Sequence, residues 1–167
     1  WIEEHDIEAQ TEAFRFQFRL AQSRELPISI HCLRAWGLLH DLLKEEGSSV
    51  HGFLLHSYGG PLEMVETFVA LGARFSFSGY FASDDKSKKR AAFDRVPLDR
   101  LLIESDAPDM LGPEELILEE LRDKNGRPIN SPLNLPRTYE YVAGMRNMSL
   151  EMLIPVVAEN FETFFHR

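Results

Sequence analysis

The sequence contains a single cysteine, Cys32, among its 167 residues. One cysteine excludes an intrachain disulfide and a zinc site built on cysteines. We therefore expect a reducing compartment, such as the cytoplasm or the nucleus. No signal peptide is visible, and because the chain begins at Trp1 instead of methionine, its targeting cannot be read from the sequence.

Long apolar runs and basic residues are also scarce. No run approaches the roughly 18–20 residues that a membrane span needs, so we expect no membrane partner. Lys and Arg number 18 against 27 Asp and Glu, which gives a net charge of −9. This balance disfavours broad, salt-sensitive binding to nucleic acid, because neutralising phosphates requires Lys and Arg. It does not exclude a nuclease whose own charge is offset by bound metal.

Length and composition are those of one globular domain over residues 1–167. Hydrophobic residues make up 44% and charged residues 27% of the chain, which argues against disorder. We find no linker, internal repeat or low-complexity segment.

Short apolar runs alternate with longer amphipathic segments. We expect strands at 28–31, 52–56, 73–79 and 101–106, and helices at 8–25, 33–46, 61–71, 113–122, 136–147 and 149–165. Nearly all-apolar strands that alternate with helices are typical of an α/β fold with a parallel sheet. Four strands suffice for an open sheet, whereas a closed (β/α)₈ barrel needs eight and about 250 residues. If the fold is a barrel, this chain is the C-terminal half of one.

Three polar residues end predicted strands: His31 the first, His56 the second and Asp106 the fourth. Ligands bind at the C-terminal ends of parallel strands. Two imidazoles and a carboxylate suit Zn²⁺, Mn²⁺, Fe or Co better than Mg²⁺ or Ca²⁺, and such a metal would lower the pKa of bound water. The alternative is that each His is a hydrogen-bonded polar cap of its strand.

The remaining reactive side chains have simpler interpretations. His5 lies in an acidic tail, and His40 and His166 are expected on the surface. His51 lies at the N-terminal end of its strand, opposite to the end where ligands bind. Cys32 follows His31 on the opposite face of the strand and is expected to be a small packed residue.

A basic cluster interrupts the otherwise acidic chain at Lys86, Lys88, Lys89 and Arg90. The segment 82–92 around it is expected to be a solvated loop with a short helix. The alternative function of the cluster is contact with a phosphate-bearing substrate.

Several short motifs occur in an order that resembles the TatD-type deoxyribonuclease family. These motifs are Gln10…Phe14…Gln17…Leu20-Ala21, Pro27…His31-Cys32…Ala35, His56-Ser57-Tyr58-Gly59-Gly60, Phe77-Ser78-Gly79, Leu101-Leu102-Ile103-Glu104-Ser105-Asp106-Ala107-Pro108, Asn134, and Asn160…Phe164. The family comprises metal-dependent hydrolases with an amidohydrolase-like (β/α)₈ barrel.

The resemblance implies a role for each matched residue. His31 and His56 would hold one divalent metal together with a bridging glutamate, and Asp106 would ligate a second metal and orient or deprotonate the attacking water. Glu104 would not bind the metal itself but would contact the ligands and orient them. The implied reaction is hydrolysis of DNA phosphodiester bonds between two metals, and Zn, Mn, Mg, Co and Ni are not distinguished.

The sequence departs from the family pattern at its start. The H-x-H pair of the first barrel strand and the G-E-x-G-L-D segment that carries the bridging glutamate are absent, so we expect about four β/α units from the C-terminal half of the barrel. Leu33 stands where many members have Arg, and Ser57-Tyr58 replaces Cys-Phe. Half a barrel would leave apolar interior open to water and two unpaired edges through which copies associate. The alternative functions are a truncated, non-catalytic chain and hydrolysis of another ester or amide.

Overall fold

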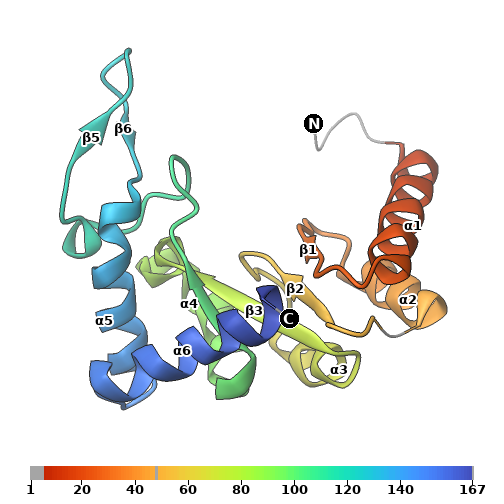
Figure 1. Cartoon of the computed structure of the whole chain (residues 1–167). Coiled ribbons are helices and arrows are strands. Elements are labelled where there is room, and N and C mark those ends of the chain that lie inside the picture. The colour runs from red at the N-terminus through yellow and green to blue at the C-terminus, as the bar shows by residue number, and fades with distance from the viewer. Residues whose placement is uncertain (1–5, 48, 167) are drawn as a thin grey trace.

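The computed structural model describes residues 6–47 and 49–166 (Figure 1). Its helices are α1 (Ile7–Ser23), α2 (Trp36–Glu46), α3 (Val65–Ala70), α4 (Ser87–Arg90), α5 (Leu135–Met145) and α6 (Leu150–Phe165). Its strands are β1 (Ser29–Ile30), β2 (Phe53–Leu55), β3 (Ala73–Ser78), β4 (Leu101–Glu104), β5 (Leu121–Arg122) and β6 (Pro128–Ile129). Within these ranges, no helix is long and apolar enough to cross a membrane.

The first four strands form one parallel sheet in the order β1-β2-β3-β4. This confirms the predicted α/β fold with a parallel sheet. The strands are shorter than predicted; β4 ends at Glu104, and Asp106 has a left-handed backbone with φ of 61°, which an extended strand cannot continue through. The strands β1 and β4 lie at the two edges of this sheet.

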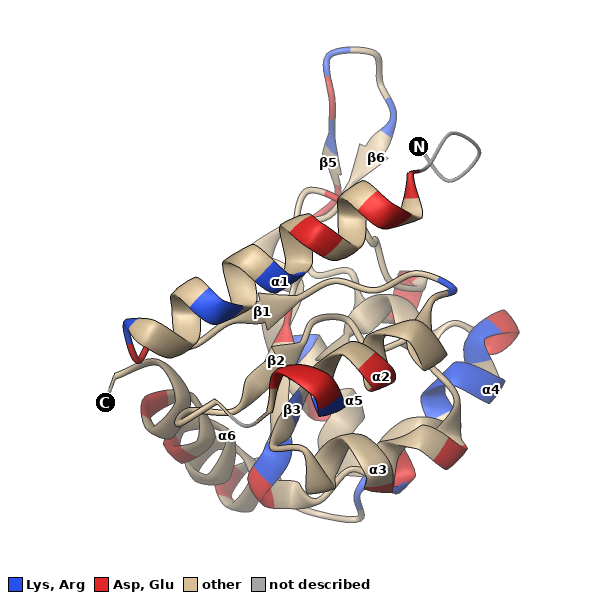
Figure 2. Ribbon diagram, turned by 90° about the vertical axis from the view of Figure 1, so that its right-hand side faces the viewer, with Lys and Arg blue, Asp and Glu red and all other residues tan. Residues whose placement is uncertain are grey.

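One face of the sheet carries the main core. Phe53, Leu55, Phe75, Phe77 and Leu101 alternate toward this face and are each at most 1% exposed. They pack against residues of α2 and α3 such as Leu39, Leu43, Val65 and Phe68. Figure 2 shows α2 and α3 together on this side of the sheet and α6 on the other side.

The opposite face of the sheet carries small polar side chains at its centre, namely Ser76 and Ser78 of β3, and both are buried. The same face carries Leu54 and Leu102, which are covered by Phe164 from the last turn of α6. Because α6 folds back over them, these two positions are shielded from water. Leu54 and Leu102 are only 6% and 5% exposed.

The predicted helix at 113–122 is wrong. Glu114–Leu116 forms a single 3₁₀ turn, and β5 pairs with β6 in an antiparallel hairpin that projects from the body of the molecule (Figure 1). The side chain of Asp123 accepts hydrogen bonds from the backbone amides of Asn125 and Arg127, which closes the hairpin turn. Within the predicted helix, the amides of Leu118 and Glu119 donate to Oδ1 of Asn134 instead of to carbonyls of a helix.

The other predicted helices are found with shifted ends. The predicted helix at 61–71 begins with a 3₁₀ turn at Leu62–Met64 and continues as α3. The segment 82–92 contains the short α4 between 3₁₀ turns, as expected for a charged connection.

Candidate metal centre

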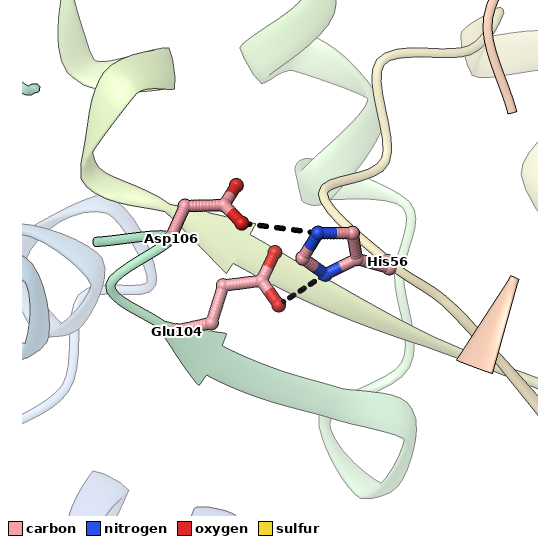
Figure 3. A group of neighbouring side chains, drawn as sticks. All are labelled: His56, Glu104 and Asp106. Atoms are coloured by element: carbon pink, nitrogen blue, oxygen red, sulfur yellow. Dashed lines mark hydrogen bonds and ion pairs between the residues drawn. The ribbon is translucent and has the colours of Figure 1, made fainter. Parts of the chain in front are cut away.

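The imidazole of His56 lies between two carboxylates at the C-terminal ends of the strands (Figure 3). Its Nδ1 is 2.8 Å from Oε2 of Glu104, and its Nε2 is 3.0 Å from Oδ1 of Asp106. One ligand atom from each residue lies within 4.8 Å of the others. All three side chains are partly buried, with exposed fractions of 30%, 19% and 14% for His56, Glu104 and Asp106.

His56 follows β2 and Glu104 ends β4, although these two strands are not neighbours in the sheet. The intervening strand β3 presents Ser76 and Ser78 on the same face, and Ser78 is paired in register with Glu104. Because serine side chains are short, the longer side chains from β2 and β4 meet above them. A large residue at Ser76 or Ser78 would fill that space.

The backbone on both sides of the cluster is left-handed, with φ of 47° at Ser57 and 61° at Asp106. Such a conformation costs a non-glycine residue on the order of 1–3 kcal/mol and persists where other contacts hold it. The amide of Ser57 donates to Oγ of Ser76 at 3.0 Å, and the side-chain amide of Asn130 donates to the carbonyl of Ser105 at 2.6 Å. These bonds fix the turns that aim His56 and Asp106 at each other.

The two carboxylates favour the charged form of His56. Its pKa is raised to about 10, chiefly by the hydrogen bond to Asp106 and then by the bond to Glu104, against the opposing effect of burial. Burial is the largest single influence on the pKa of Asp106 and would raise it. The hydrogen bond from His56, the charge of His56 and smaller contributions from Ser57 and His31 together outweigh burial, so the pKa is lowered. At neutral pH both ring N–H groups of His56 therefore donate to carboxylates.

The cluster offers donor atoms of the kind that divalent cations bind. Oε1 of Glu104 is buried and accepts no hydrogen bond from any residue that the structure describes. The donor set of imidazole nitrogen and carboxylate oxygen matches Zn²⁺, Mn²⁺, Fe and Co. A metal would replace the proton that His56 directs at Asp106, since metal ligands bind deprotonated.

His31 lies beside this cluster but outside its hydrogen bonds. It follows β1, its side chain is exposed, and its ring centroid is 5.6 Å from that of His56. Of the three predicted ligands, His56 and Asp106 are thus in direct contact. Glu104 also contacts His56, whereas the family resemblance gives it only the role of orienting the ligands. The ligand roles of His31, His56 and Asp106 stay predictions.

The cysteine and the remaining histidines lie outside the cluster of His56, Glu104 and Asp106. Cys32 is half-buried against the core, and burial raises the pKa of its thiol, as expected for a packed residue. His40 is partly exposed, pairs with Asp41 at 3.0 Å, and its ring lies 6.1 Å from that of Phe68. His166 is exposed beside Glu162, and His51 lies at the far end of β2. His5 lies outside the described residues.

A cleft of about 1130 Å³ opens over the cluster. Its lining includes His31, His56 and Asp106, together with the cationic side chains of Arg34, Lys88 and Lys89. The sequence pattern singles out both lysines but not Arg34, because nothing in the sequence indicates that the connection after β1 faces the one before β4.

A family model described as "TatD related DNase" matches residues 1–166. The chain belongs to this family. It is 31% identical over 156 residues to the uncharacterized metal-dependent hydrolase YabD of Bacillus subtilis, covering 93% of this chain and 57% of that protein. It is 30% identical over 157 residues to the 3′-5′ ssDNA/RNA exonuclease TatD of a Rahnella strain, covering 93% and 57%.

The fold of this TatD-related chain is shared with a solved structure. A TatD family hydrolase from Entamoeba histolytica superposes with a TM-score of 0.80 at 22% identity, covering 97% of this chain and 58% of that one. The chain thus spans less than two thirds of the length of these proteins. The expectation that the shared part is specifically the C-terminal half of a barrel is not confirmed by these comparisons.

Proposed function

We propose that this TatD-related chain carries metal-ligating and catalytic residues of a hydrolase that cleaves phosphodiester bonds of DNA. The observation that carries the proposal is the position of His56 between Glu104 and Asp106 in a cleft with cationic side chains. The relatives named as 3′-5′ ssDNA/RNA exonucleases support a nucleic-acid substrate.

In this proposal His31, His56 and Asp106 hold divalent metal. Bound metal supplies Lewis acidity, which lowers the pKa of water and offsets the charge of the phosphate. Glu104 accepts the Nδ1–H of His56 and so turns the other ring nitrogen toward the cleft. Glu104 is therefore a positioning residue.

Asp106 is the proposed catalytic residue. Its carboxylate borders the cleft, and its lowered pKa keeps it ionised at neutral pH. An ionised carboxylate at this place can orient a water molecule and accept its proton.

We propose further that residues 1–167 are a single domain equivalent to about four β/α units from the C-terminal half of a (β/α)₈ barrel. The family's H-x-H and G-E-x-G-L-D segments, which the sequence lacks, would supply the remaining ligands of a two-metal site. The edge strands β1 and β4 would then let copies of the chain associate. Sedimentation over a range of concentrations tests this last point.

The second candidate function is a non-catalytic TatD-related chain. The absence of the H-x-H and bridging-glutamate motifs favours it, because fewer ligands bind metal more weakly. Such a chain would bind Mn²⁺ or Zn²⁺ weakly and release no nucleotides.

The test is hydrolysis of a labelled single-stranded DNA by the purified chain, first stripped with EDTA and then supplied with Mn²⁺, Zn²⁺ or Mg²⁺. We expect metal-dependent cleavage that falls more than ~10²-fold in His56→Ala and in Asp106→Ala. The control is His166→Ala, which removes an exposed histidine paired with Glu162. Cleavage that survives chelation and both substitutions contradicts the proposal, and no cleavage with any metal favours the second candidate.

A further inference from the structure

Four of the cations in the connection between β3 and β4 lie within residues 86–90 and divide into two pairs with different surroundings. They are Lys86, Lys88, Lys89 and Arg90. In Figure 2 the segment α4 stands out as a basic stretch. The structure shows which of these side chains stabilise the fold and which remain available for a ligand.

Arg90 and Lys86 are used within the fold. The guanidinium of Arg90 donates to the carbonyls of Phe81, Ala82 and Ser83 at 2.9, 3.1 and 3.0 Å, which ties α4 to the turn that follows β3. Lys86 pairs with Asp85, and its ammonium lies 4.8 Å from the centre of the Tyr80 ring.

Lys88 and Lys89 have no such partners. Both side chains are exposed, and neither forms an ion pair or hydrogen bond within residues 6–47 and 49–166. Both line the cleft that also contains His56 and Asp106. Exposed lysines are common on protein surfaces, and it is the position of these two lysines at the cleft that indicates a ligand.

Lys89 reaches the loop that begins at His56. A Cβ atom on Gly59 would lie 3.5 Å from Nζ of Lys89, so the ammonium is held against the backbone three residues after His56. Arg34 approaches the same cleft from the connection after β1, has φ of 57°, and forms no ion pair with any described residue. Two separate strand-to-helix connections thus direct unpaired cations at one cleft.

The charge of the whole chain makes this placement specific. The net charge is −9, and Glu63, Asp106 and Asp109 also line the cleft. The acidic side chains near the cleft would repel a polyanion. Because charges more than about 8–10 Å apart are screened at physiological salt, only cations close to the cleft can offset this repulsion. Three unpaired cations at the rim supply this compensation.

We propose that Lys88, Lys89 and Arg34 bind the backbone phosphates of a single nucleic-acid strand and so position it over His56 and Asp106. This inference rests on the proposed function for its substrate class. The contacts go to phosphates, so they position the strand without reading its sequence. The three are positioning residues.

The test measures binding, apart from hydrolysis, with a fluorescein-labelled dT₁₂ oligonucleotide in EDTA. Anisotropy titrations at several NaCl concentrations give the slope of log K against log salt, whose magnitude is about 0.7 for each phosphate of a single strand that the protein neutralises. We expect this magnitude to be smaller by about 1.4 in Lys88→Ala/Lys89→Ala, and Arg34→Ala to remove about 0.7 more. Lys88→Arg/Lys89→Arg should keep the wild-type slope.

The matched control is Lys44→Ala/Lys124→Ala. It removes two exposed lysines, also without ion pairs within the described ranges, that lie outside the cleft. A control slope that changes as much as that of the cleft variant overturns the proposal, as does wild-type protein that does not bind dT₁₂. Circular dichroism confirms that each variant is folded.

Hydrolysis with Mn²⁺ on the same preparations separates this inference from the proposed function. Binding with the expected slopes but no cleavage contradicts the catalytic function and leaves the phosphate contacts standing. Cleavage with unchanged slopes contradicts the phosphate contacts alone.

Discussion

The imidazole of His56 and the carboxylate of Asp106 lie 3.0 Å apart although the strands that precede them, β2 and β4, are separated by β3. The contact therefore depends on the order of the sheet and on the short side chains of Ser76 and Ser78 between the two strands. It places a nitrogen and a carboxylate oxygen at the floor of a cleft, where each biases the protonation of the other.

Replacing Glu104 by Gln should weaken metal binding. The substitution keeps the size of the side chain but removes the negative charge beside Nδ1 of His56, which orients the ring. We expect Mn²⁺ or Zn²⁺ affinity, measured by isothermal titration calorimetry, to fall by about 10–100-fold. The control is Glu162→Gln, which alters a surface glutamate paired with His166 away from the cleft. Equal affinities of wild type and Glu104→Gln would contradict the role assigned to Glu104.

Acid should weaken the contact between α1 and α2 through Glu46. The hydrogen bond from Arg19 is the main cause of the lowered pKa of Glu46, whose side chain is 4% exposed. A depressed pKa stabilises the fold above the ordinary value of 4.5, and this contribution is lost as pH falls through the folded-state pKa. The free energies of unfolding of wild type and Glu46→Gln in urea should therefore differ at pH 7 and converge toward pH 3.

The control for this pH series is Glu140→Gln on α5. Glu140 pairs with Arg137 of the same helix and is 46% exposed, so its loss should change the unfolding free energy little at either pH. A constant gap between wild type and Glu46→Gln from pH 7 to pH 3 would refute the linkage.

Two glycines with similar backbone angles should respond differently to alanine. Gly52 has φ of 70°, and a Cβ there would lie 2.1 Å from the carbonyl oxygen of Gly72. Gly126 has φ of 78° and open space around it. The left-handed backbone costs alanine about 1–2 kcal/mol, and steric overlap adds about 1–3 kcal/mol. Urea unfolding should show Gly126→Ala destabilised by the first amount only and Gly52→Ala by the sum.

Truncating Phe164 should destabilise the chain much more than truncating its neighbour. Phe164 is 1% exposed and covers Leu54 and Leu102 on the second face of the sheet, whereas Phe165 is 38% exposed. We expect Phe164→Ala to lower the free energy of unfolding by about 3–5 kcal/mol. Similar losses for Phe164→Ala and Phe165→Ala would show that α6 does not cover this face in solution.

The alternation of apolar strands and amphipathic helices is sufficient to predict the parallel sheet. His56 and Asp106 can be found from sequence because a polar residue directly after a buried strand lies at the C-terminal edge of the sheet. Both inferences use local patterns, in which the period of the side chains reports the element and its end. The same reasoning fails at 113–122, where Asn134, distant in the sequence, accepts hydrogen bonds from the amides of Leu118 and Glu119.

The sequence by itself determined the four strands of the parallel sheet and the motifs of the TatD family. Only the tertiary structure decided that Glu104 shares His56 with Asp106, that His31 stays beside this group, and that Lys88 and Lys89 face the cleft while Arg90 braces a turn. The physical reason is that local spacing sets the direction of a side chain relative to its own element. Which side chains meet depends on sheet order, on small residues between strands and on the path of the connecting loops.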